Sequence, residues 1–301
     1  MHTVKIEAPG KINLTLDVKG KRSDGYHELE TVMHQIDLFD CITIESRSSG
    51  IKIASNSSSI PLGEENLAYK AALMILQEYQ PGAGIKIFIE KNIPVGAGLA
   101  GGSTDAAAVL VGINHLYNCR FSRPQLLKMA AAIGSDVAFC LSGHYFEARP
   151  GELVSRGFTA IARGRGELLE SLPPRIIPNI VIVKPEFELS TPQVYSELDL
   201  EAVEQFPDNG GFLQAWNKGD IINISVYMAN VLESVSISKK PEIGIIKSRL
   251  IEMGALSALM SGSGPSVFAI FPNNETALKA YQVFREDYQE IYLLSSYKRG
   301  D

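Results

Sequence analysis

The chain has 301 residues, 45% of them hydrophobic and 21% charged, and its formal net charge is −6. A chain of this length can bury one large hydrophobic core or two smaller ones. It has no apolar run long enough to span a bilayer and begins with no signal-like segment, so we expect a cytoplasmic protein with no membrane partner. The acidic balance argues against broad binding of nucleic acid, although it is compatible with a local basic pocket for an anion.

The three cysteines, Cys41, Cys119 and Cys140, are far apart in the sequence and lie in apolar surroundings. An odd number of scattered cysteines favours neither a disulfide framework nor a zinc site. We therefore expect reduced thiols in the hydrophobic core.

The first half of the chain predicts a mixed sheet with helices on one side. Alternating apolar runs separated by turns predict strands over residues 4–7, 11–18, 29–33 and 40–45. Helical spacing of apolar residues predicts a helix over 66–79, and a strand at 85–90 follows it. A glycine-rich segment then leads into a long helix that begins at Ala106, and a further helix over 124–133 precedes Asp136.

The second half predicts an α+β sandwich. We expect strands at 180–184, on both sides of a loop at Ser261, and at 291–295. We expect helices over residues 213–219, 221–232, 241–253 and 275–288. Prolines and glycines crowd between residues 150 and 180, so we divide the chain into an N-terminal domain of residues 1–160 and a C-terminal domain of residues 161–301.

The glycine-rich segment, residues 94–104, is a candidate phosphate-binding loop. It joins a strand to a helix, where free backbone N–H groups and the positive end of the helix dipole favour an anion. Gly96, Gly98 and Gly101 also match the dinucleotide fingerprint G-x-G-x-x-G, but the sequence continues as helix where a second strand ending in an acidic residue should follow. A Walker A loop is excluded because Gly102 stands where its lysine would be. A glycine-rich turn that serves only close packing is the alternative.

Two further blocks give this loop a context. The first is Ala8-Pro-Gly-Lys-Ile-Asn-Leu14 followed by Gly20 to Leu29, and the second is Leu259 to Phe268, a glycine-serine loop between apolar strands. In this order the three blocks resemble the GHMP kinase superfamily, named for galacto-, homoserine, mevalonate and phosphomevalonate kinases. The phrases that begin at Lys11, Asp24 and Gly134 are similar to those of members whose acceptor is an alcohol carrying a cytidine diphosphate.

The resemblance spans nearly the whole chain and implies an α+β fold of two domains. The N-terminal domain would be an S5-like mixed sheet with helices, and the C-terminal domain a ferredoxin-like α/β sandwich. The active site would lie in the cleft between them. The implied reaction is phosphoryl transfer from ATP, with Mg²⁺, to a hydroxyl of a small molecule. We expect a monomer or weak homodimer that binds no nucleic acid.

The resemblance also implies which residues bind ATP. They are Pro94, Val95, Gly96, Ala97, Gly98, Leu99, Ala100, Gly101, Gly102, Ser103 and Thr104, with Asn66 and Lys91 near the adenine. Mg²⁺ would be bound with the ATP phosphates, and Ser103 and Thr104 are the candidate protein ligands. Both hydroxyls could equally cap a helix that begins at Ala106. Ala100 stands where these kinases usually have glycine.

Asp136 and Lys11 are the candidate catalytic residues. Asp136 follows Gly134-Ser135 after a helix, so a turn could present its carboxylate to the cleft as the general base; the alternative is a helix cap. Strand alternation places Lys11 on the face of Asn13, opposite Ile12, which predicts a polar cleft wall. A lysine near Asp136 would keep that carboxylate ionised and stabilise charge on the transferred phosphoryl group. An exposed strand lysine is the alternative.

The substrate residues implied by the resemblance are Asn13, Tyr26, His27 and Asp136. Asn13 and Asp136 would hold the alcohol, Tyr26 would stack on the cytosine and His27 would read its edge. Without the resemblance, a Tyr-His pair that seals a loop against the sheet is the simpler interpretation of Tyr26 and His27. Two other functions stay open: a GHMP kinase for another small alcohol, such as homoserine or mevalonate, and a non-enzymatic S5-like RNA-binding module.

The segment Arg149 to Ile161 has no counterpart that we expect in this superfamily. Pro150, Gly151 and Gly157 separate short apolar pieces within it. We therefore predict a surface hairpin extension that takes no part in the site.

Overall fold

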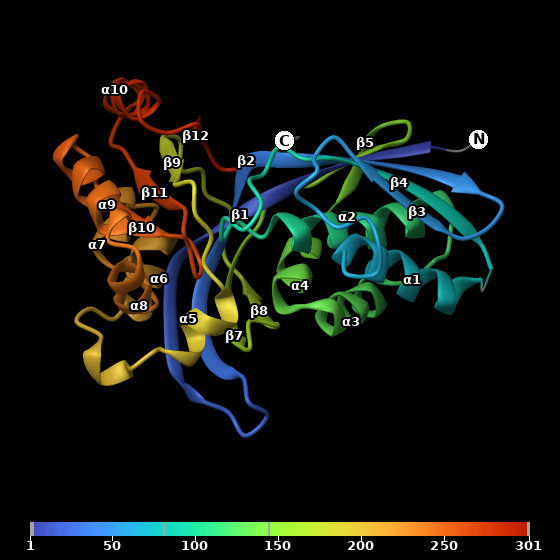
Figure 1. Cartoon of the computed structure of the whole chain (residues 1–301), viewed down its shortest axis with the longest axis horizontal. Coiled ribbons are helices and arrows are strands. Elements are labelled where there is room, and N and C mark those ends of the chain that lie inside the picture. Colours follow the sequence, from blue (N-terminus) through green and yellow to red (C-terminus); the bar gives the residue numbers. More distant parts are fainter. Residues whose placement is uncertain (1–2, 81, 144, 300–301) are drawn as a thin grey trace.

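The computed structural model describes residues 3–80, 82–143 and 145–299, and it has two lobes (Figure 1). Each lobe is built on its own sheet with helices packed against it, and the long strands of one hairpin extend from one lobe to the other. None of the helices in these described ranges combines the length and apolarity that a bilayer crossing requires.

The hairpin consists of β1 (Thr3–Lys21) and β2 (His27–Arg47), paired antiparallel from Thr3 opposite Glu45 to Lys21 opposite His27. Each strand replaces two shorter predicted strands. Register shifts at Pro9/Lys11 and Asn13/Thr15 interrupt the pairing. Such irregularities bend a strand and re-aim its side chains. Here they flank the two residues, Lys11 and Asn13, that were predicted to face the cleft.

The N-terminal lobe contains an eight-stranded sheet in the order β3-β4-β2-β1-β6-β5, with β7 paired to β2 and β8 paired to β7. The remaining strands are β3 (Ile51–Ser55), β4 (Gly84–Glu90), β5 (Phe146–Arg149), β6 (Glu152–Val154), β7 (Thr159–Gly164) and β8 (Leu168–Ser171). Helices α1 (Leu67–Tyr79), α2 (Gly101–Leu116), α3 (Arg123–Ile133) and α4 (Ser135–Leu141) cover one face (Figure 1).

The helix α2 lies very close to this sheet because its buried face is made of small residues. Ala106, Ala107 and Ala108 are fully buried, and a methyl group added at Gly112 would lie 2.5 Å from the Ile44 side chain. The short distance removes apolar surface from water and fixes where α2 begins.

The prediction that Arg149 to Ile161 is a surface extension is wrong. The strand β6 pairs in parallel with β1, and β7 pairs antiparallel with β2 over six residues. Leu153, Ser155 and Ala160 are buried. The segment is part of the main sheet, because its short apolar pieces find partners on strands more than a hundred residues away in the sequence.

The C-terminal lobe has a four-stranded antiparallel sheet in the order β10-β11-β9-β12. Its strands are β9 (Ile180–Lys184), β10 (Ser257–Met260), β11 (Val267–Ile270) and β12 (Glu290–Leu294). Its helices are α5 (Thr191–Ser196), α6 (Asn209–Lys218), α7 (Ile221–Val226), α8 (Glu233–Lys239), α9 (Glu242–Glu252) and α10 (Asn274–Phe284), with a short 3₁₀ turn, η1, at Leu200–Ala202. In chain order this is strand, helices, strand, strand, helix, strand with strand order 2-3-1-4, the ferredoxin-like arrangement that was predicted.

The predicted division at residue 160 falls inside β7, a strand of the first sheet. The change from one sheet to the other comes after β8, in the linker between Ser171 and Ile180. A hydrophobic cluster that includes Ile12, Ile161, Ile182 and Phe268 joins the two lobes. The lobes therefore share a core, which holds the cleft between them in a defined shape.

Candidate active site

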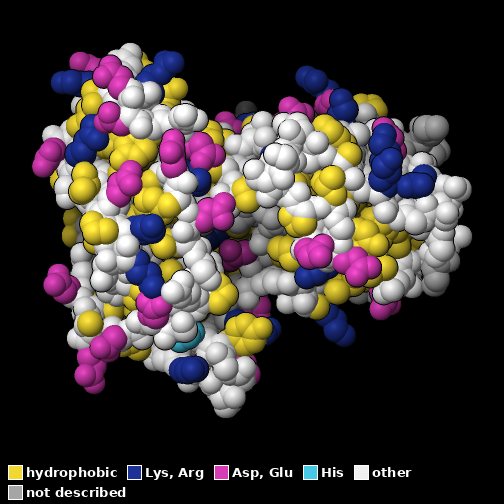
Figure 2. All heavy atoms as spheres, in the orientation of Figure 1, with side chains coloured by type: hydrophobic (Ala, Val, Ile, Leu, Met, Phe, Trp, Pro, Cys, Tyr) yellow, Lys and Arg dark blue, Asp and Glu magenta, His cyan; other side chains and the backbone are white. Residues whose placement is uncertain are grey.

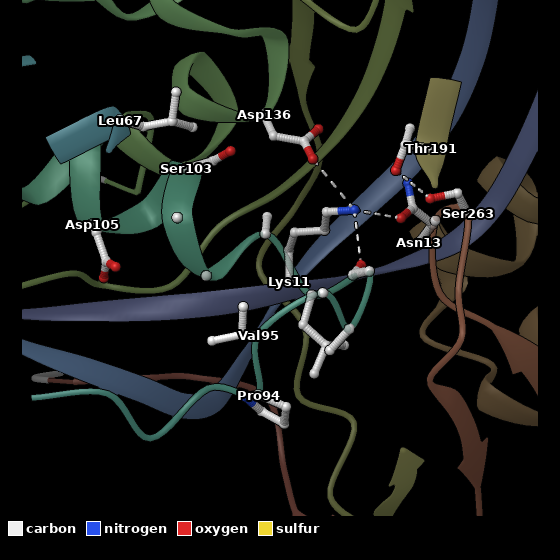
Figure 3. Close-up of a pocket in the computed structure, with 18 of the residues that line it drawn as sticks. Lys11, Asn13, Leu67, Pro94, Val95, Ser103, Asp105, Asp136, Thr191 and Ser263 are labelled. Carbon is white, nitrogen blue, oxygen red and sulfur yellow. Dashed lines mark hydrogen bonds and ion pairs between the residues drawn. The ribbon is translucent and has the colours of Figure 1, made fainter. Parts of the chain in front are cut away.

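A pocket of about 430 Å³ lies between the lobes (Figures 2 and 3). Figure 2 shows the furrow between the lobes on the surface of the molecule. The pocket walls come from β1, β2, the glycine-rich loop, the start of α2, α4, α5 and the loop after β10. Both lobes contribute, as the sequence predicted.

The predicted phosphate loop forms the longest continuous stretch of this pocket. Residues 94 to 103 all line it. The helix α2 begins at Gly101, so the prediction that it starts at Ala106 is wrong by more than one turn. The first N–H groups of α2 therefore belong to the loop itself, and the positive end of the helix dipole faces the pocket. This geometry suits a phosphate.

The two predicted hydroxyls differ in position. Ser103 lines the pocket, and Figure 3 shows its hydroxyl pointing to the side where Asp136 lies. Thr104 is fully buried, does not line the pocket, and its Oγ1 has no hydrogen-bond partner in the structure. Because α2 begins earlier than predicted, neither residue is its N-cap; that position is Ala100.

Two glycines let the loop lie directly against the C-terminal lobe. A methyl group on Gly98 would lie 2.2 Å from the carbonyl oxygen of Ser261, and one on Gly96 would lie 2.6 Å from Glu188 Cδ. Both glycines have φ values of +64° to +75°, which other residues rarely adopt. The Ser261 hydroxyl donates to the Gly98 carbonyl at 3.0 Å, so the loop after β10 fixes the phosphate loop.

Lys11 lies in a buried polar network beside the phosphate loop. Its ammonium donates to Asn13 Oδ1 at 2.7 Å and to the Gly98 carbonyl at 3.3 Å. Asn13 in turn donates to Thr31 Oγ1 at 2.8 Å. Since these partners are neutral, they orient the ammonium without neutralising its charge.

Asp136 is the one carboxylate in an ion pair with Lys11 within the described ranges. Its Oδ2 lies 3.6 Å from Lys11 Nζ, and its side chain is 41% exposed while that of Lys11 is 4% exposed. Figure 3 shows the two groups meeting across the pocket. Asp136 is in the first turn of α4, whose N-cap is Gly134, so its carboxylate is not used as a cap. A loose contact with an open side leaves room for a hydroxyl between carboxylate and phosphate.

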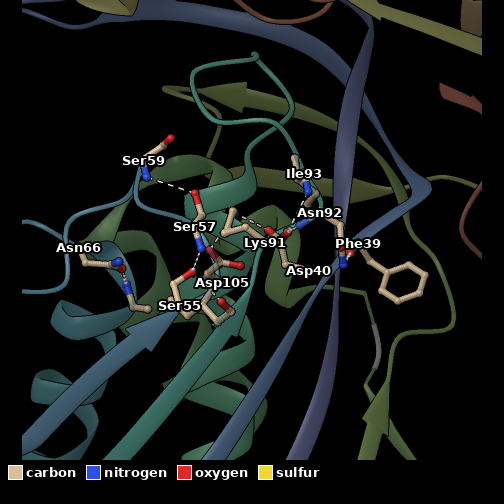
Figure 4. Close-up of polar contacts among 12 residues, drawn as sticks. Phe39, Asp40, Ser55, Ser57, Ser59, Asn66, Lys91, Asn92, Ile93 and Asp105 are labelled. Atoms are coloured by element: carbon tan, nitrogen blue, oxygen red, sulfur yellow. Dashed lines mark hydrogen bonds and ion pairs between the residues drawn. The ribbon is translucent and has the colours of Figure 1, made fainter. Parts of the chain in front are cut away.

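A second lysine cluster, shown in Figure 4, lies at the end of β4, where the chain leads into the phosphate loop. The Lys91 ammonium forms ion pairs with Asp40 and, at 3.1 Å, with Asp105, and all three side chains are at most 5% exposed. Asp40 Oδ1 also accepts from the backbone N–H groups of Asn92 at 2.6 Å and Ile93 at 2.9 Å. The cluster thus fixes the strand end that leads into the loop to both β2 and α2.

The pKa values in this cluster reflect burial and crowding. Burial raises the pKa of Asp105 well above its ordinary value; Lys91 opposes this rise and Asp40 adds to it. Burial lowers the pKa of Lys91, but Asp105 and Asp40 outweigh that effect and raise it overall. Lys91 and Asp105 also line the pocket. The ammonium predicted to lie near adenine is already paired twice, and the backbone N–H of Lys91 donates to Asn56 Oδ1 at 2.8 Å, so the contact of Lys91 with adenine stays a prediction.

Asn66 also lines the pocket, but its side chain has a structural task. Its Oδ1 accepts from Ala68 N at 2.8 Å as the N-cap of α1, and its Nδ2 donates to the Pro61 carbonyl at 2.7 Å. Its predicted contact with adenine stays a prediction.

Tyr26 and His27 lie at the edge of the pocket and do not line it. Tyr26 is 57% exposed, and the Arg165 guanidinium lies 4.9 Å from the centre of its ring. The His27 ring lies 5.3 Å from the ring of Tyr195. Burial, and then Lys21, lower the pKa of His27, which favours the neutral ring that can both donate and accept a hydrogen bond.

Sequence reasoning missed three residues of this region. Tyr195 and Arg165 line the pocket and connect it to His27 and Tyr26. Thr191 also lines it, and its hydroxyl lies 2.6 Å from that of Ser263. None of the three belongs to the blocks that suggested the family. The one sequence feature that could have pointed to them is the segment Gly164-Arg-Gly-Glu167, which contains Arg165, but its glycine spacing indicates only a turn.

No group of three or more His, Cys, Asp or Glu side chains within the described ranges is arranged to hold a metal ion. Mg²⁺ often binds through one or two protein oxygens together with substrate phosphates. The Ser103 hydroxyl on the pocket wall meets that smaller requirement.

Comparison with known proteins identifies the class. The model of the GHMP kinases N terminal domain matches residues 66–144, and that of the GHMP kinases C terminal domain matches residues 212–290. The chain belongs to the GHMP kinase family, as the sequence predicted, and it is a kinase.

The relatives narrow the class. The chain is 62% identical over 292 residues, 97% of its length and 98% of the relative's, to the 4-diphosphocytidyl-2-C-methyl-D-erythritol kinase of Syntrophomonas wolfei. It is 42% identical, over 100% of its length and 97% of the relative's, to the kinase of the same name from Clostridioides difficile. A crystal structure of a 4-(cytidine 5'-diphospho)-2C-methyl-D-erythritol kinase has 33% identity and a TM-score of 0.80, covering 99% of this chain and 100% of that one.

A more distant likeness bears on the fold alone. A homoserine kinase from Cytophaga hutchinsonii has 20% identity and a TM-score of 0.74, covering 99% of this chain and 95% of that one. The predicted two-domain fold is therefore confirmed. The RNA-binding alternative is not supported, because the relatives that match over the whole length are kinases.

Proposed function

We propose that this chain transfers the γ-phosphoryl group of ATP to the C2 hydroxyl of 4-diphosphocytidyl-2-C-methyl-D-erythritol, in the non-mevalonate route of isoprenoid biosynthesis. The products are the 2-phosphate and ADP. The observation that carries the proposal is the pairing of Lys11 and Asp136, 3.6 Å apart, in the pocket that the phosphate loop lines. The name shared by the most similar relatives described above supports the acceptor.

Asp136 acts in this proposal as the general base. Its carboxylate accepts the proton of the acceptor hydroxyl as the oxygen attacks the γ-phosphorus, and the bond from that phosphorus to the ADP oxygen breaks. Lys11, held by Asn13 and the Gly98 carbonyl, places positive charge beside the transferred group and keeps Asp136 ionised. Because Lys11 is buried, little water competes for its ammonium.

The phosphate loop and α2 hold the ATP phosphates in this proposal through backbone N–H groups. We assign Mg²⁺ to the Ser103 hydroxyl together with those phosphates, because Ser103 lines the pocket whereas Thr104 is buried and does not. When bound, Mg²⁺ offsets the negative charge of the β- and γ-phosphates.

Tyr26, His27 and Tyr195 form the proposed nucleobase end of the site. Tyr26 offers an exposed ring, and the neutral His27 lies against Tyr195 at the pocket edge. Stacking of a base on an aromatic ring contributes about 1–3 kcal/mol, so a cytidine diphosphate on the acceptor would add binding energy far from the reacting hydroxyl.

A panel of acceptors tests this assignment. The cytidylated alcohol, free methylerythritol phosphate, homoserine, mevalonate and galactose are each offered with ATP and Mg²⁺. We expect phosphorylation of the cytidylated alcohol alone, and inhibition by CMP or CDP that competes with the acceptor but not with ATP. The variant Tyr26→Ala should raise KM for the acceptor by roughly tenfold and leave KM for ATP nearly unchanged.

Tyr79→Ala is a matched control because Tyr79 is also a partly exposed tyrosine, but on α1 and away from the pocket lining. Efficient phosphorylation of an uncytidylated acceptor, with none of the cytidylated one, would contradict the substrate and leave the family intact.

A further inference from the structure

A second cavity of about 660 Å³ lies on a different part of the molecule. It is bounded by His34 on β2, the loop before β7, the linker after β8, the helices α6 and α7, and the end of the described chain at Tyr297 and Lys298. Among the residues described it shares no lining residue with the active site. Its volume lies in the range of about 300–1,000 Å³ that is usual for small-molecule sites.

The inner wall of this cavity is apolar. Its hydrophobic lining residues are Phe158, Leu172, Pro174, Ile176, Ile177, Trp216, Ile221 and Ile224. Ile177, Trp216 and Ile224 are almost completely buried. The indole N–H of Trp216 donates to the Pro173 carbonyl at 2.9 Å, so its only polar atom is satisfied outside the cavity. A ligand would therefore meet the apolar lining residues that keep exposed surface, among them Leu172, Ile176 and Ile221.

The charged groups of the cavity are all basic. Arg156, Arg175 and Lys298 belong to its lining, and no Asp or Glu does among the described residues. Arg156 and Lys298 are exposed and Arg175 is half-buried, so the cations lie toward solvent and the apolar wall lies inside. This local excess of positive charge stands out in a chain whose net charge is −6. Such a field attracts an anion.

Arg175 is held in place without a countercharge. Its Nε donates to the Trp216 carbonyl at 3.1 Å and its Nη2 to the Asn217 carbonyl at 2.5 Å. These acceptors lie at the end of α6, where the helix dipole favours a cation. Both of these partners are neutral carbonyls, and within the described ranges no carboxylate forms an ion pair with Arg175, so its charge remains available to a ligand.

The polar floor of the cavity is rigid and neutral. The His34 ring lies 2.7 Å from Thr159 Oγ1 through Nδ1 and 2.6 Å from Ser296 Oγ through Nε2. Ser296 Oγ also accepts from Ile177 N at 2.7 Å. Burial lowers the pKa of His34 to about 4, so the ring is neutral near pH 7. The floor needs no ligand to satisfy it, and the charge of the site comes from the basic rim.

We propose that this second cavity is a binding site for an amphipathic anion, a molecule with an aromatic or branched apolar body and one anionic head group. The body packs against Leu172, Ile176 and Ile221, which keep exposed surface, and the head group pairs with Arg175 at the rim. The site is separate from the kinase pocket, so occupation by the anion and by ATP is compatible.

The single tryptophan of the chain reports directly on this site. The probe is 1-anilinonaphthalene-8-sulfonate, and N-phenyl-1-naphthylamine, the same ring system without the sulfonate, is its neutral counterpart. Selective excitation of Trp216 should give energy transfer to the bound anionic probe, because Trp216 lines the cavity. We expect transfer at one saturable site, with an affinity that saturating ATP and CDP change by less than about twofold.

Two substitutions test the rim. Ile176→Glu places a carboxylate at a lining position that is 46% exposed, and Arg175→Gln removes the cation. Each should lower the affinity for the anionic probe at least about fivefold. Arg175→Gln should change the affinity for the neutral probe by less than about twofold. The matched controls are Ile222→Glu, at an apolar position of α7 that is 65% exposed and does not line the cavity, and Arg285→Gln. Both controls should bind the anionic probe like the parent chain.

The thermal midpoint and the Trp216 emission verify that each variant is folded. Arg175→Gln could disturb the fold, because Arg175 also binds the end of α6. Ile176→Glu tests the same rim without removing that contact. Absence of energy transfer from Trp216, unchanged affinity in both rim variants, or displacement of the probe by ATP would overturn the proposal.

Discussion

Two lysine-aspartate clusters lie next to the phosphate loop, and they differ in how the lysine is neutralised. Lys11 is bound by an amide oxygen and a carbonyl, with one half-exposed carboxylate at 3.6 Å. Lys91 is bound by two fully buried carboxylates. In the first arrangement the positive charge of the lysine remains available to a substrate. In the second it is neutralised by carboxylates of the fold. The two lysines are therefore distinguished by their partners and not by their burial, and the neutral partners of Lys11 fit the catalytic role that we propose for it.

The largest expected effect comes from the closed cluster. Lys91→Met leaves Asp40 and Asp105 buried together without a cation, so it should lower the free energy of unfolding by about 3–5 kcal/mol. Urea denaturation measures this loss. Lys86→Met is the matched control, because Lys86 forms an exposed pair with Glu45 at 2.9 Å that should contribute less than about 1 kcal/mol. Equal, small losses in both variants would remove the distinction between the clusters.

The open cluster should respond in rate and not in stability. Asp136→Ala should lower kcat at least about a hundredfold, the usual contribution of a positioned general base, with little change in KM for ATP. Lys11→Ala should act in the same direction. Because Asp136 is partly exposed, the free energy of unfolding of the Asp136→Ala variant should differ from that of the parent chain by less than about 1 kcal/mol. Near-normal turnover of Asp136→Ala would contradict its role as the base.

His34 is a third buried ionisable residue, but unlike Lys91 it is buried in its neutral form. Its folded pKa is about 4, below the usual value near 6.5. The unfolded chain therefore binds a proton first as the pH falls, and stability that is complete above about pH 6.5 is lost down to about pH 4. Between about pH 7.5 and pH 5 the loss should be about 2 kcal/mol. Urea titrations at both pH values measure it, and His34→Gln should abolish this part of the difference; an equal pH dependence in that variant would refute it.

The smallest expected effect lies in the phosphate loop that both clusters adjoin. Ala100 has a φ of 60°, a left-handed conformation that is unfavourable for any residue with a side chain other than Asn or Asp. Ala100→Gly should stabilise the chain by about 1 kcal/mol or less, because the relief of strain exceeds the added entropy of the unfolded state. The thermal midpoint should rise slightly. A lower midpoint would show that packing of the Ala100 methyl group outweighs its strain.

The sequence by itself determined the local parts of this protein. Glycine spacing between a strand and a helix predicted the phosphate loop, and alternation on the first strand placed Lys11 and Asn13 on a polar face. The order of strands and helices predicted an α+β sandwich for the second lobe, and the family resemblance implied the ferredoxin-like form that the structure has. These features depend on neighbours a few residues away, and the motifs that carried the family resemblance are of the same local kind.

Tertiary structure alone decided what depends on distant partners. The ammonium of Lys91 is neutralised by Asp40, which is 51 positions away in the sequence. Tyr195 lines the pocket from a short helix that carries no recognisable motif. The strands β5 and β6 have only four and three residues, so their pattern could not reveal that β6 pairs with β1. The second cavity exists only because segments from β2 to the end of the described chain, far apart in the sequence, meet near Trp216. Such contacts follow from packing of the whole chain, which spacing along a single sequence does not encode.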